Sequence, residues 1–431
     1  MAKTRAFLTA IIFLFSASAF ALDLTDVYDG LGSAFYNFVD PNEGMSSFQS
    51  LNITSGGREE SLGGAFTGLA DDIGFFESNP AGSCLLQKGE FALFHNSWIA
   101  DSNIETLAWA DRFENLGLGA KLKCFYVPFT EYNYFGDRVS ANYYSETTAC
   151  FNVSYNFFKG YYFKGLALGM NVKAAWRSVP DYADNETDAV IQGSGLAQSA
   201  LGVMADVGAL LSFDLMKNFA SREPNFRLGV SVLNLGAAFK GFGGQGDFGL
   251  DDPLPTCACV GASYRPFKKL ALAFDFRQPL NFQDFSKSGM WSAGAGVEIL
   301  ITDFLEIMAG FRLKGANPRI SLGTEFQIKR FVFDLNYTFD LTSSMNPVNH
   351  FSLSARVNLG DHGRKSRRDR CDALYTQGLD EYAKGNYDAA VQYWEAALKE
   401  DKSFTPAQRW VDTVRGSQRL YNRVLEIQSL D

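Results

Sequence analysis

The feature that most constrains this 431-residue chain is an alternation of apolar and polar residues that runs, with interruptions, from residue 91 to residue 359. In 331–339, for example, every second residue is Phe, Leu or Tyr, and the residues between them include Asp334, Asn336 and Thr338. Successive side chains of a β-strand point to opposite faces, so each such strand has one apolar and one polar face. A soluble β-sandwich turns the apolar face inward, whereas a membrane barrel turns it toward lipid.

The lengths of the strands and of their connections favour the barrel. We expect about 14 strands, most of them about 9 to 11 residues long or longer, as a tilted strand needs in order to cross a bilayer. Turns on one side are short, at 159–161, 266–268 and 329, and the other side has long loops at 127–144, 178–199 and 236–255. Short periplasmic turns and long outer loops are typical of outer-membrane barrels. The sequence therefore predicts an all-β transmembrane barrel of about 14 antiparallel strands over residues 89–360.

The N-terminus has the pattern of a secretory signal peptide. Lys3 and Arg5 precede an apolar run over 6–15, and Ala19-Phe20-Ala21 resembles a cleavage site. We expect residues 1–21 to be removed on export. Beyond them the sequence contains no uninterrupted apolar run of the roughly 18 residues that a membrane helix needs. The chain is thus predicted to reach the outer membrane and to span it with strands.

Residues 22–88 are predicted to form a lead-in and a helical plug inside the barrel. Within 61–82, Ala65, Phe66, Leu69 and Ala70 could form one apolar side of a short helix, and Gly63, Gly64 and Gly68 would let its backbone approach a wall closely. The turn residues Asn79, Pro80, Ala81 and Gly82 end it. A surface helix followed by a turn is the alternative. Glycines on the polar strand faces, Gly117, Gly119, Gly294 and Gly296, either make room for a plug or ligand or relieve strand curvature.

The Gly- and Ala-rich segment with Asp71 and Asp72, closed by Asn79-Pro80-Ala81 and followed by alternating strands, resembles the N-terminal hatch of the FadL family of long-chain fatty-acid outer-membrane transporters. It is most similar to the treponemal FadL-like paralogues. The resemblance implies ligand binding at the extracellular side and gating by the hatch. Asn79, Pro80 and Ala81 match the family motif, and Asp71 and Asp72 are assigned a gating or anchoring role.

After residue 360 the pattern changes from strands to helices. Residues 361–370, DHGRKSRRDR, are predicted to be a basic linker that is either a solvated hinge or a contact with anionic lipid head groups. The spacing of Gly378, Tyr387, Ala390, Trp394 and Ala397 resembles a tetratricopeptide repeat, so 371–431 is expected to be a small all-α periplasmic domain. Because a single repeat buries little surface, we expect these residues to bind a periplasmic protein or a second copy of the chain.

Composition and motifs exclude other classes of function. The net charge of −9 argues against a nucleic-acid partner. The six cysteines have no zinc-site spacing and the chain has three histidines, so we expect no metal and no cofactor. No nucleophile motif lies beside His95 or His350, which argues against an enzyme. With these classes set aside, the resemblance to the FadL family implies passive uptake of hydrophobic small molecules, with long-chain fatty acids as candidates. The alternative is a FadL-like barrel that acts as a protein-binding scaffold or surface receptor.

Overall fold

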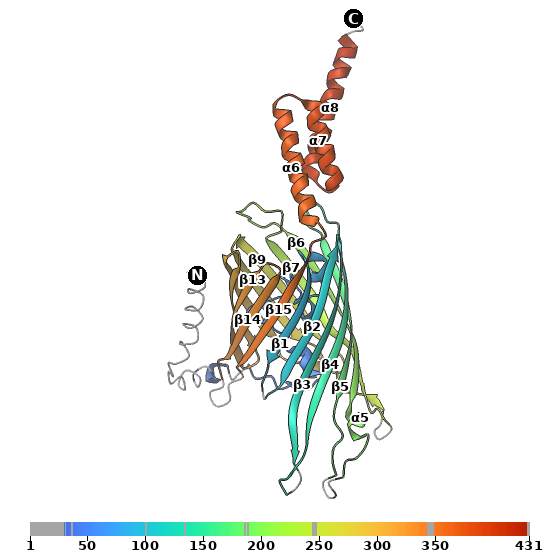
Figure 1. The fold of residues 1–431 in the computed structure, drawn as a ribbon, viewed down its shortest axis with the longest axis vertical. Coiled ribbons are helices and arrows are strands. Elements are labelled where there is room, and N and C mark those ends of the chain that lie inside the picture. Colours follow the sequence, from blue (N-terminus) through green and yellow to red (C-terminus); the bar gives the residue numbers. More distant parts are fainter. Residues whose placement is uncertain are drawn as a thin grey trace.

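The computed structural model describes residues 30–428 except 31, 36–37, 100, 133–134, 185–186, 188, 244–247 and 343–348. This part of the chain consists of a β-barrel, a segment packed within it and three C-terminal helices that extend from one end (Figure 1). The predicted signal peptide, residues 1–21, lies outside the described residues. Among the helices that are described, none is long and apolar enough to cross a membrane.

The barrel is a closed antiparallel sheet in which, apart from one two-residue strand, each strand pairs with its neighbours in the chain and the first strand pairs with the last. The two-residue β8 adds to one edge of β7 and brings the sheet to 15 strands, so 14 strands form the wall. The bounds are β1 (Gly89–Ser97), β2 (Asn103–Phe113), β3 (Leu116–Tyr132), β4 (Arg138–Phe157), β5 (Leu166–Ser178), β6 (Ala200–Phe213), β7 (Phe226–Lys240), β8 (Gly249–Leu250), β9 (Cys257–Phe267), β10 (Leu270–Pro279), β11 (Ser292–Thr302), β12 (Leu305–Lys314), β13 (Asn317–Ile328), β14 (Phe331–Asp340) and β15 (His350–Gly360).

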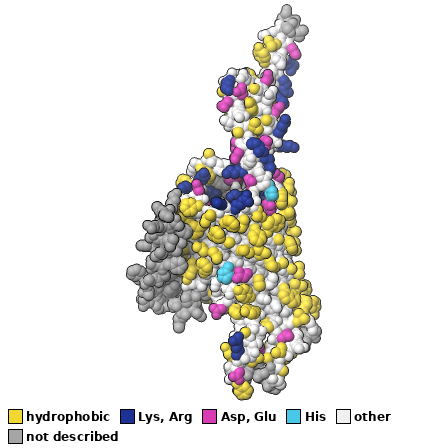
Figure 2. All heavy atoms as spheres, in the orientation of Figure 1, with side chains coloured by type: hydrophobic (Ala, Val, Ile, Leu, Met, Phe, Trp, Pro, Cys, Tyr) yellow, Lys and Arg dark blue, Asp and Glu magenta, His cyan; other side chains and the backbone are white. Residues whose placement is uncertain are grey.

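The wall turns its apolar face outward, as the alternation predicts. Along β14, Phe331, Phe333, Leu335, Tyr337 and Phe339 are exposed, and the residues between them are buried in the lumen. The same side chains would form the interior of a soluble sandwich, so their exposure rules out that alternative. Figure 2 shows the resulting apolar band around the visible face of the barrel.

The two ends of the barrel differ. At one end, here called the turn end, several connections are two residues long, at 114–115, 268–269, 303–304 and 329–330. The opposite end, here called the loop end, carries the connections 179–199 and 241–256. The predicted loop over 127–144 is wrong in part, because β3 and β4 continue to Tyr132 and from Arg138 and pair along this stretch. The two strands thus extend at the loop end as a long hairpin (Figure 1).

Residues 47–88, here called the inner segment, cross the lumen from the loop end to the start of β1. Nearly every residue from 54 to 84 is buried, which excludes a surface helix. The segment contains η3 (Gln49–Asn52), α3 (Arg58–Ser61), α4 (Phe75–Ser78) and η4 (Pro80–Leu85). The expected helix through Ala65 and Leu69 does not form, because Gly63 and Gly64 adopt positive φ angles of 66° and 77° and turn the chain there.

Glycines on both sides allow the inner segment to touch the wall. A Cβ atom on Gly310 of β12 would lie 2.1 Å from the backbone nitrogen of Gly63, and one on Gly117 of β3 would lie 2.3 Å from that of Cys84. No side chain fits at such distances. Of the two roles proposed for glycine on the strand faces, close approach of a second backbone therefore applies here.

The chain continues from β15 into α6 (Arg364–Ala383), α7 (Tyr387–Glu400) and α8 (Thr405–Gln428), which extend from the turn end (Figure 1). The expected linker over 361–370 is wrong for most of its length, because α6 already begins at Arg364. Its basic side chains bind the barrel: Arg364 donates to the carbonyl oxygen of Gln87 at 2.8 Å, and Arg368 pairs with Glu223 at 2.5 Å. These partners, distant in sequence, hold the segment in a helix.

Candidate functional site

The Asn79-Pro80-Ala81 turn lies inside the barrel and is hydrogen-bonded to its wall. The Asn79 side chain donates to the carbonyl oxygen of Ala209 in β6 at 3.1 Å and to that of Thr67 at 3.0 Å, and it accepts from the backbone N–H of Ala81 at 3.1 Å. Asn152 of β4 donates to the carbonyl oxygen of Pro80 at 2.9 Å. The turn therefore fixes the inner segment to two strands and to itself.

Asp71 and Asp72 take part in a buried charge network. Arg58 of α3 lies 2.9 Å from an Asp71 oxygen, 3.0 Å from an Asp72 oxygen and 2.5 Å from Glu298 of β11. Arg356 of β15 binds the same Asp72 oxygen at 3.1 Å. The acidic pair thus joins the inner segment to strands β11 and β15 through two arginines. Removing one member of such a buried group leaves its partners' charges uncompensated, which costs about 3–5 kcal/mol.

A second charge cluster was not identified from the sequence. Glu77 of α4 accepts from Lys121 at 2.8 Å and from Lys123 at 3.0 Å, and both lysines are on the lumen face of β3. Lys173 of β5 pairs with Asp206 of β6 at 2.6 Å. The alternation places the lysines on the polar face, but it does not say which carboxylate they meet. Among the described residues, no group of three or more His, Cys, Asp or Glu side chains is placed to hold a metal ion.

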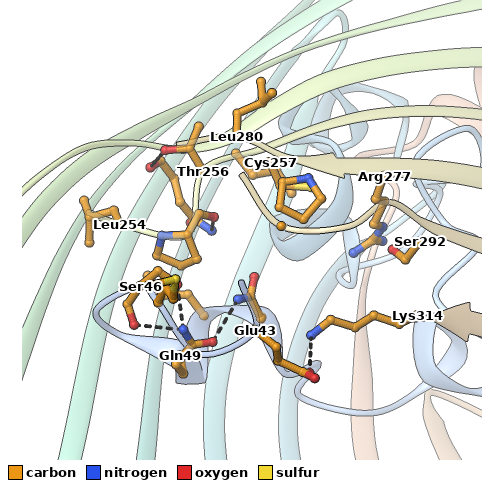
Figure 3. A pocket seen from close by; sticks show the side chains of 18 of the residues that line it. Glu43, Ser46, Gln49, Leu254, Thr256, Cys257, Arg277, Leu280, Ser292 and Lys314 are labelled. Carbon is orange, nitrogen blue, oxygen red and sulfur yellow. Dashed lines mark hydrogen bonds and ion pairs between the residues drawn. The ribbon is translucent and has the colours of Figure 1, made fainter. Parts of the chain in front are cut away.

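Two adjacent cavities lie between the inner segment and the loop end. The smaller, of about 110 Å³, is lined by polar residues together with Leu254, Leu280 and Cys257 (Figure 3). The larger, of about 300 Å³, is lined in part by Trp98 and Ile99. Arg312 and Lys314 of β12 line both cavities, so the two share a wall. Cavities of about 300 Å³ and above are the size in which proteins hold small molecules.

The larger cavity has a basic wall. Arg312, Lys314 and Arg319 contribute side chains to it. Lys314 is 3.8 Å from Glu43, whereas Arg312 and Arg319 form no ion pair with any residue that the structure describes. Arg319 instead stacks over the Trp98 ring, with its guanidinium carbon 5.5 Å from the ring centroid. The wall therefore offers positive charge beside an aromatic surface, which suits an anion with an apolar part.

The residues predicted to bind a partner are mainly interior residues of the helices. Ala390, Trp394 and Ala397 are fully buried, and a Cβ atom on Gly378 would lie 2.3 Å from the Trp394 ring nitrogen. Trp394 stacks on Trp410 of α8, with ring centroids 5.5 Å apart. Only Tyr387 of the five is exposed. The other four lie in the core of the helices. Tyr387 is therefore the one residue of these five that a partner could contact.

The sequence of the chain is similar to those of a known protein family. The model of the "Uncharacterised protein family (UPF0164)" matches residues 34–362. A UPF0164 protein of Treponema pallidum (strain Nichols) is 30% identical over 390 residues, which cover 88% of this chain and 85% of the relative. A second from the same organism is 26% identical over 389 residues, or 89% of this chain and 78% of the relative.

Two solved barrels are also similar. The CymD monoaromatic hydrocarbon channel is 15% identical with a TM-score of 0.48, covering 70% of this chain and 97% of that one. A Pseudomonas aeruginosa FadL homologue is 11% identical with a TM-score of 0.40, covering 68% of this chain and 96% of that one. On the strength of the family match and the Treponema relative, the chain belongs to the UPF0164 family.

Proposed function

We propose that this protein is an outer-membrane transporter for hydrophobic small molecules that carry an anionic head group, with long-chain fatty acids as the candidate cargo. The closed wall with its apolar outer face supports a place in a membrane, because all strand edges are paired and lipid can cover the exposed aromatic rings. In this orientation the loop end faces outward, and the turn end and the three helices face the periplasm.

The observation that carries the proposal is the basic wall of the larger loop-end cavity. A carboxylate head would bind Arg312, Lys314 and Arg319, whose guanidinium and ammonium groups form charge-assisted hydrogen bonds with such anions. Trp98 and Ile99 would contact the start of the alkyl chain. Because each methylene removed from water contributes about 0.8 kcal/mol, affinity is expected to rise with chain length.

The inner segment then acts as the plug. It fills the lumen between the loop-end cavities and the turn end, so cargo can pass only when the segment shifts. We assign the closed state to the Asn79-Pro80-Ala81 turn and to the Asp71 and Asp72 network, because these groups bind the segment to the wall. Transport is passive, and the incoming ligand supplies the free energy that opens the path.

The test is a titration of the refolded mature protein in a non-ionic detergent with a fluorescent long-chain fatty acid. Unlabelled hexadecanoate should compete, and hexadecanol, which lacks the charge, should compete at least about tenfold less well. Arg312→Gln and Arg319→Gln should each weaken binding to a similar degree. Arg138→Gln, an exposed arginine at the loop end away from the cavity, is the matched control. Equal competition by acid and alcohol would rule out the proposed head-group site.

A second candidate function is protein binding through the helices. The far end of α8 exposes Leu420, Tyr421, Val424, Leu425 and Ile427, and none of these residues belongs to the core of the three helices. A periplasmic carrier protein or a second copy of the chain would cover this face. Replacing Leu420 and Val424 with serine should leave fatty-acid binding intact and abolish the association. If the variant remains as self-associated as the parent by light scattering and still binds a carrier, the helix end is not the interface.

A further inference from the structure

A third cavity lies at the turn end, where the barrel meets α6. Its volume is about 310 Å³, close to that of the larger loop-end cavity. It is lined by the end of the inner segment, by residues at the turn ends of β2, β4, β6 and β7, by the first turns of α6 and by the α7–α8 connection. Figure 2 shows lysine and arginine side chains gathered at this junction, between the apolar band and the helices.

The lining of this cavity is strongly basic. Ten lysines and arginines face it against five aspartates and glutamates. The whole chain, by contrast, has a net charge of −9, so composition alone would produce an acidic lining. The five carboxylates balance only half of these positive charges, and the excess costs electrostatic free energy unless a further anion occupies the cavity.

Only some of these cations have a carboxylate partner. Arg368 pairs with Glu223, and Arg367 with Glu114. Lys159 in the β4–β5 connection and Lys365 of α6 form no ion pair within the described part of the chain. The positive charge of the cavity is therefore not cancelled by its own walls.

Two arginines in the cavity are held side by side by one carbonyl group. Arg112 of β2 and Arg364 of α6 both donate to the carbonyl oxygen of Leu86, each at 3.2 Å. Arg364 also donates to the carbonyl oxygens of Gln87 and Arg112, so its position is fixed by the backbone. Two guanidinium groups at one carbonyl repel each other, and an anion between them would relieve that repulsion.

We infer that this turn-end cavity is a binding site for a single carboxylate or phosphate group, held by Arg112, Arg364 and Lys159. The inference rests on the proposed function, because it assigns the site to the anionic head of the cargo after it has passed the inner segment. The cargo would thus meet a basic wall before the inner segment and a second one after it. The same anion would join α6 to the barrel, because Arg364 belongs to the helix and Arg112 to the wall.

The test uses the full mature protein in a non-ionic detergent and measures binding calorimetrically. The probes are inorganic phosphate, decanoate, and decanol as the uncharged control. Because the loop-end cavity is also expected to bind anions, every titration is made in an Arg312→Gln, Arg319→Gln background. In this background phosphate and decanoate should still bind, and adding Arg112→Gln with Arg364→Gln should weaken this binding at least about tenfold, as expected for the loss of charge-assisted hydrogen bonds. Lys268→Gln with Arg330→Gln removes the same charge from the turn end outside the cavity and should leave binding unchanged.

Three outcomes would overturn the inference. Unchanged phosphate binding in the Arg112 and Arg364 variant would exclude the site, and the proposed function would still stand if Arg312→Gln weakened fatty-acid binding. Phosphate binding without decanoate binding would show a site for a free anion and not for cargo. Competition by phosphatidylglycerol in nanodiscs, but not by decanoate, would identify a lipid head group as the occupant.

A second variant protects the test from misfolding. Because Arg364 also holds α6 to the barrel, its replacement could release the helix. Lys159→Gln removes a cavity charge that no described carboxylate pairs with, so docking of α6 should be unaffected. This variant should still weaken decanoate and phosphate binding several-fold, and full binding by it would contradict the assignment of Lys159.

Discussion

At the scale of single residues, buried polar side chains fix the inner segment to the wall and to itself. Asn79 makes three hydrogen bonds, one of them to the wall, and Arg58 and Arg356 meet at one Asp72 oxygen. A buried polar group that loses its partner carries a large desolvation cost. A movement of the inner segment that breaks even one of these bonds is therefore unfavourable. A ligand that replaced one of these partners could open the path without leaving a buried charge unpaired.

Asn79→Ala should loosen the inner segment. The change removes the donor to the carbonyl oxygens of Thr67 and Ala209, and a buried acceptor left unpaired costs about 1–3 kcal/mol. We expect higher permeability to small solutes in a liposome-swelling assay. Asn142→Ala, in the extended β3–β4 hairpin, is the control, and equal swelling rates for the two variants would contradict the proposed gating role of Asn79.

At the scale of elements, the alternation predicted the wall because strand facing is a local property of the chain. The path of the inner segment was not predictable in the same way. Arg58 and Glu298 are 240 positions apart, so no local pattern pairs them. The charge of the basic run at 361–370 indicates a linker, but Glu114 and Glu223, in turns far away in the sequence, hold it as the start of α6. The Asn79-Pro80-Ala81 turn was locatable because proline and asparagine restrict the backbone themselves.

Gly310→Ala tests the fit between wall and inner segment. The new Cβ would lie 2.1 Å from the backbone nitrogen of Gly63, and backbone cannot move aside as a side chain can. Overpacking of this kind costs about 1–3 kcal/mol or more. We expect a lower midpoint of denaturant unfolding and protease cleavage within residues 57–70. Gly249→Ala has open space at its Cβ and should unfold at the same denaturant concentration as the parent. An equal fall of the unfolding midpoint in this variant would attribute the effect to strand propensity instead.

The docking of α6 should weaken in acid. Burial of Glu223 opposes its ionisation, but the hydrogen bond and charge of Arg368 outweigh this and lower the pKa of Glu223. A lowered folded pKa means that the stabilisation is present above the ordinary glutamate pKa of about 4.3 and is lost as the pH falls through the folded pKa. Amides of 361–372, corrected for intrinsic rates, should exchange at most about fivefold faster in acid, since part-exposed pairs contribute about 1 kcal/mol or less.

Glu223→Gln is the matched variant for this pH dependence. It should raise the amide exchange rates of residues 361–372 near neutral pH and remove their further increase in acid. Glu395→Gln breaks an exposed pair with Arg415 within the helices and should leave the step in place. An acid response that survives in Glu223→Gln would assign the titration to another group.

At the scale of the whole molecule, the proposed orientation places the β3–β4 hairpin outside the cell and α8 in the periplasm. The side chain of Phe135 at the hairpin tip is 83% exposed. Phe135→Cys should therefore react with a membrane-impermeant maleimide on intact cells. Ser417→Cys on α8 should react only after the outer membrane is permeabilised, and the parent protein measures the background from the native cysteines. The reverse labelling pattern would invert the orientation.

The order of the chain has a consequence for biogenesis. The inner segment precedes β1, yet it is enclosed by a wall whose last seam joins β1 to β15. Its turns press against glycines on strands from β3 to β12, so it could not be threaded through a finished cylinder without disturbing them. The inner segment must therefore already occupy the lumen when β1 pairs with β15. A folding factor that brings these two strands together acts on the wall and the inner segment at the same time.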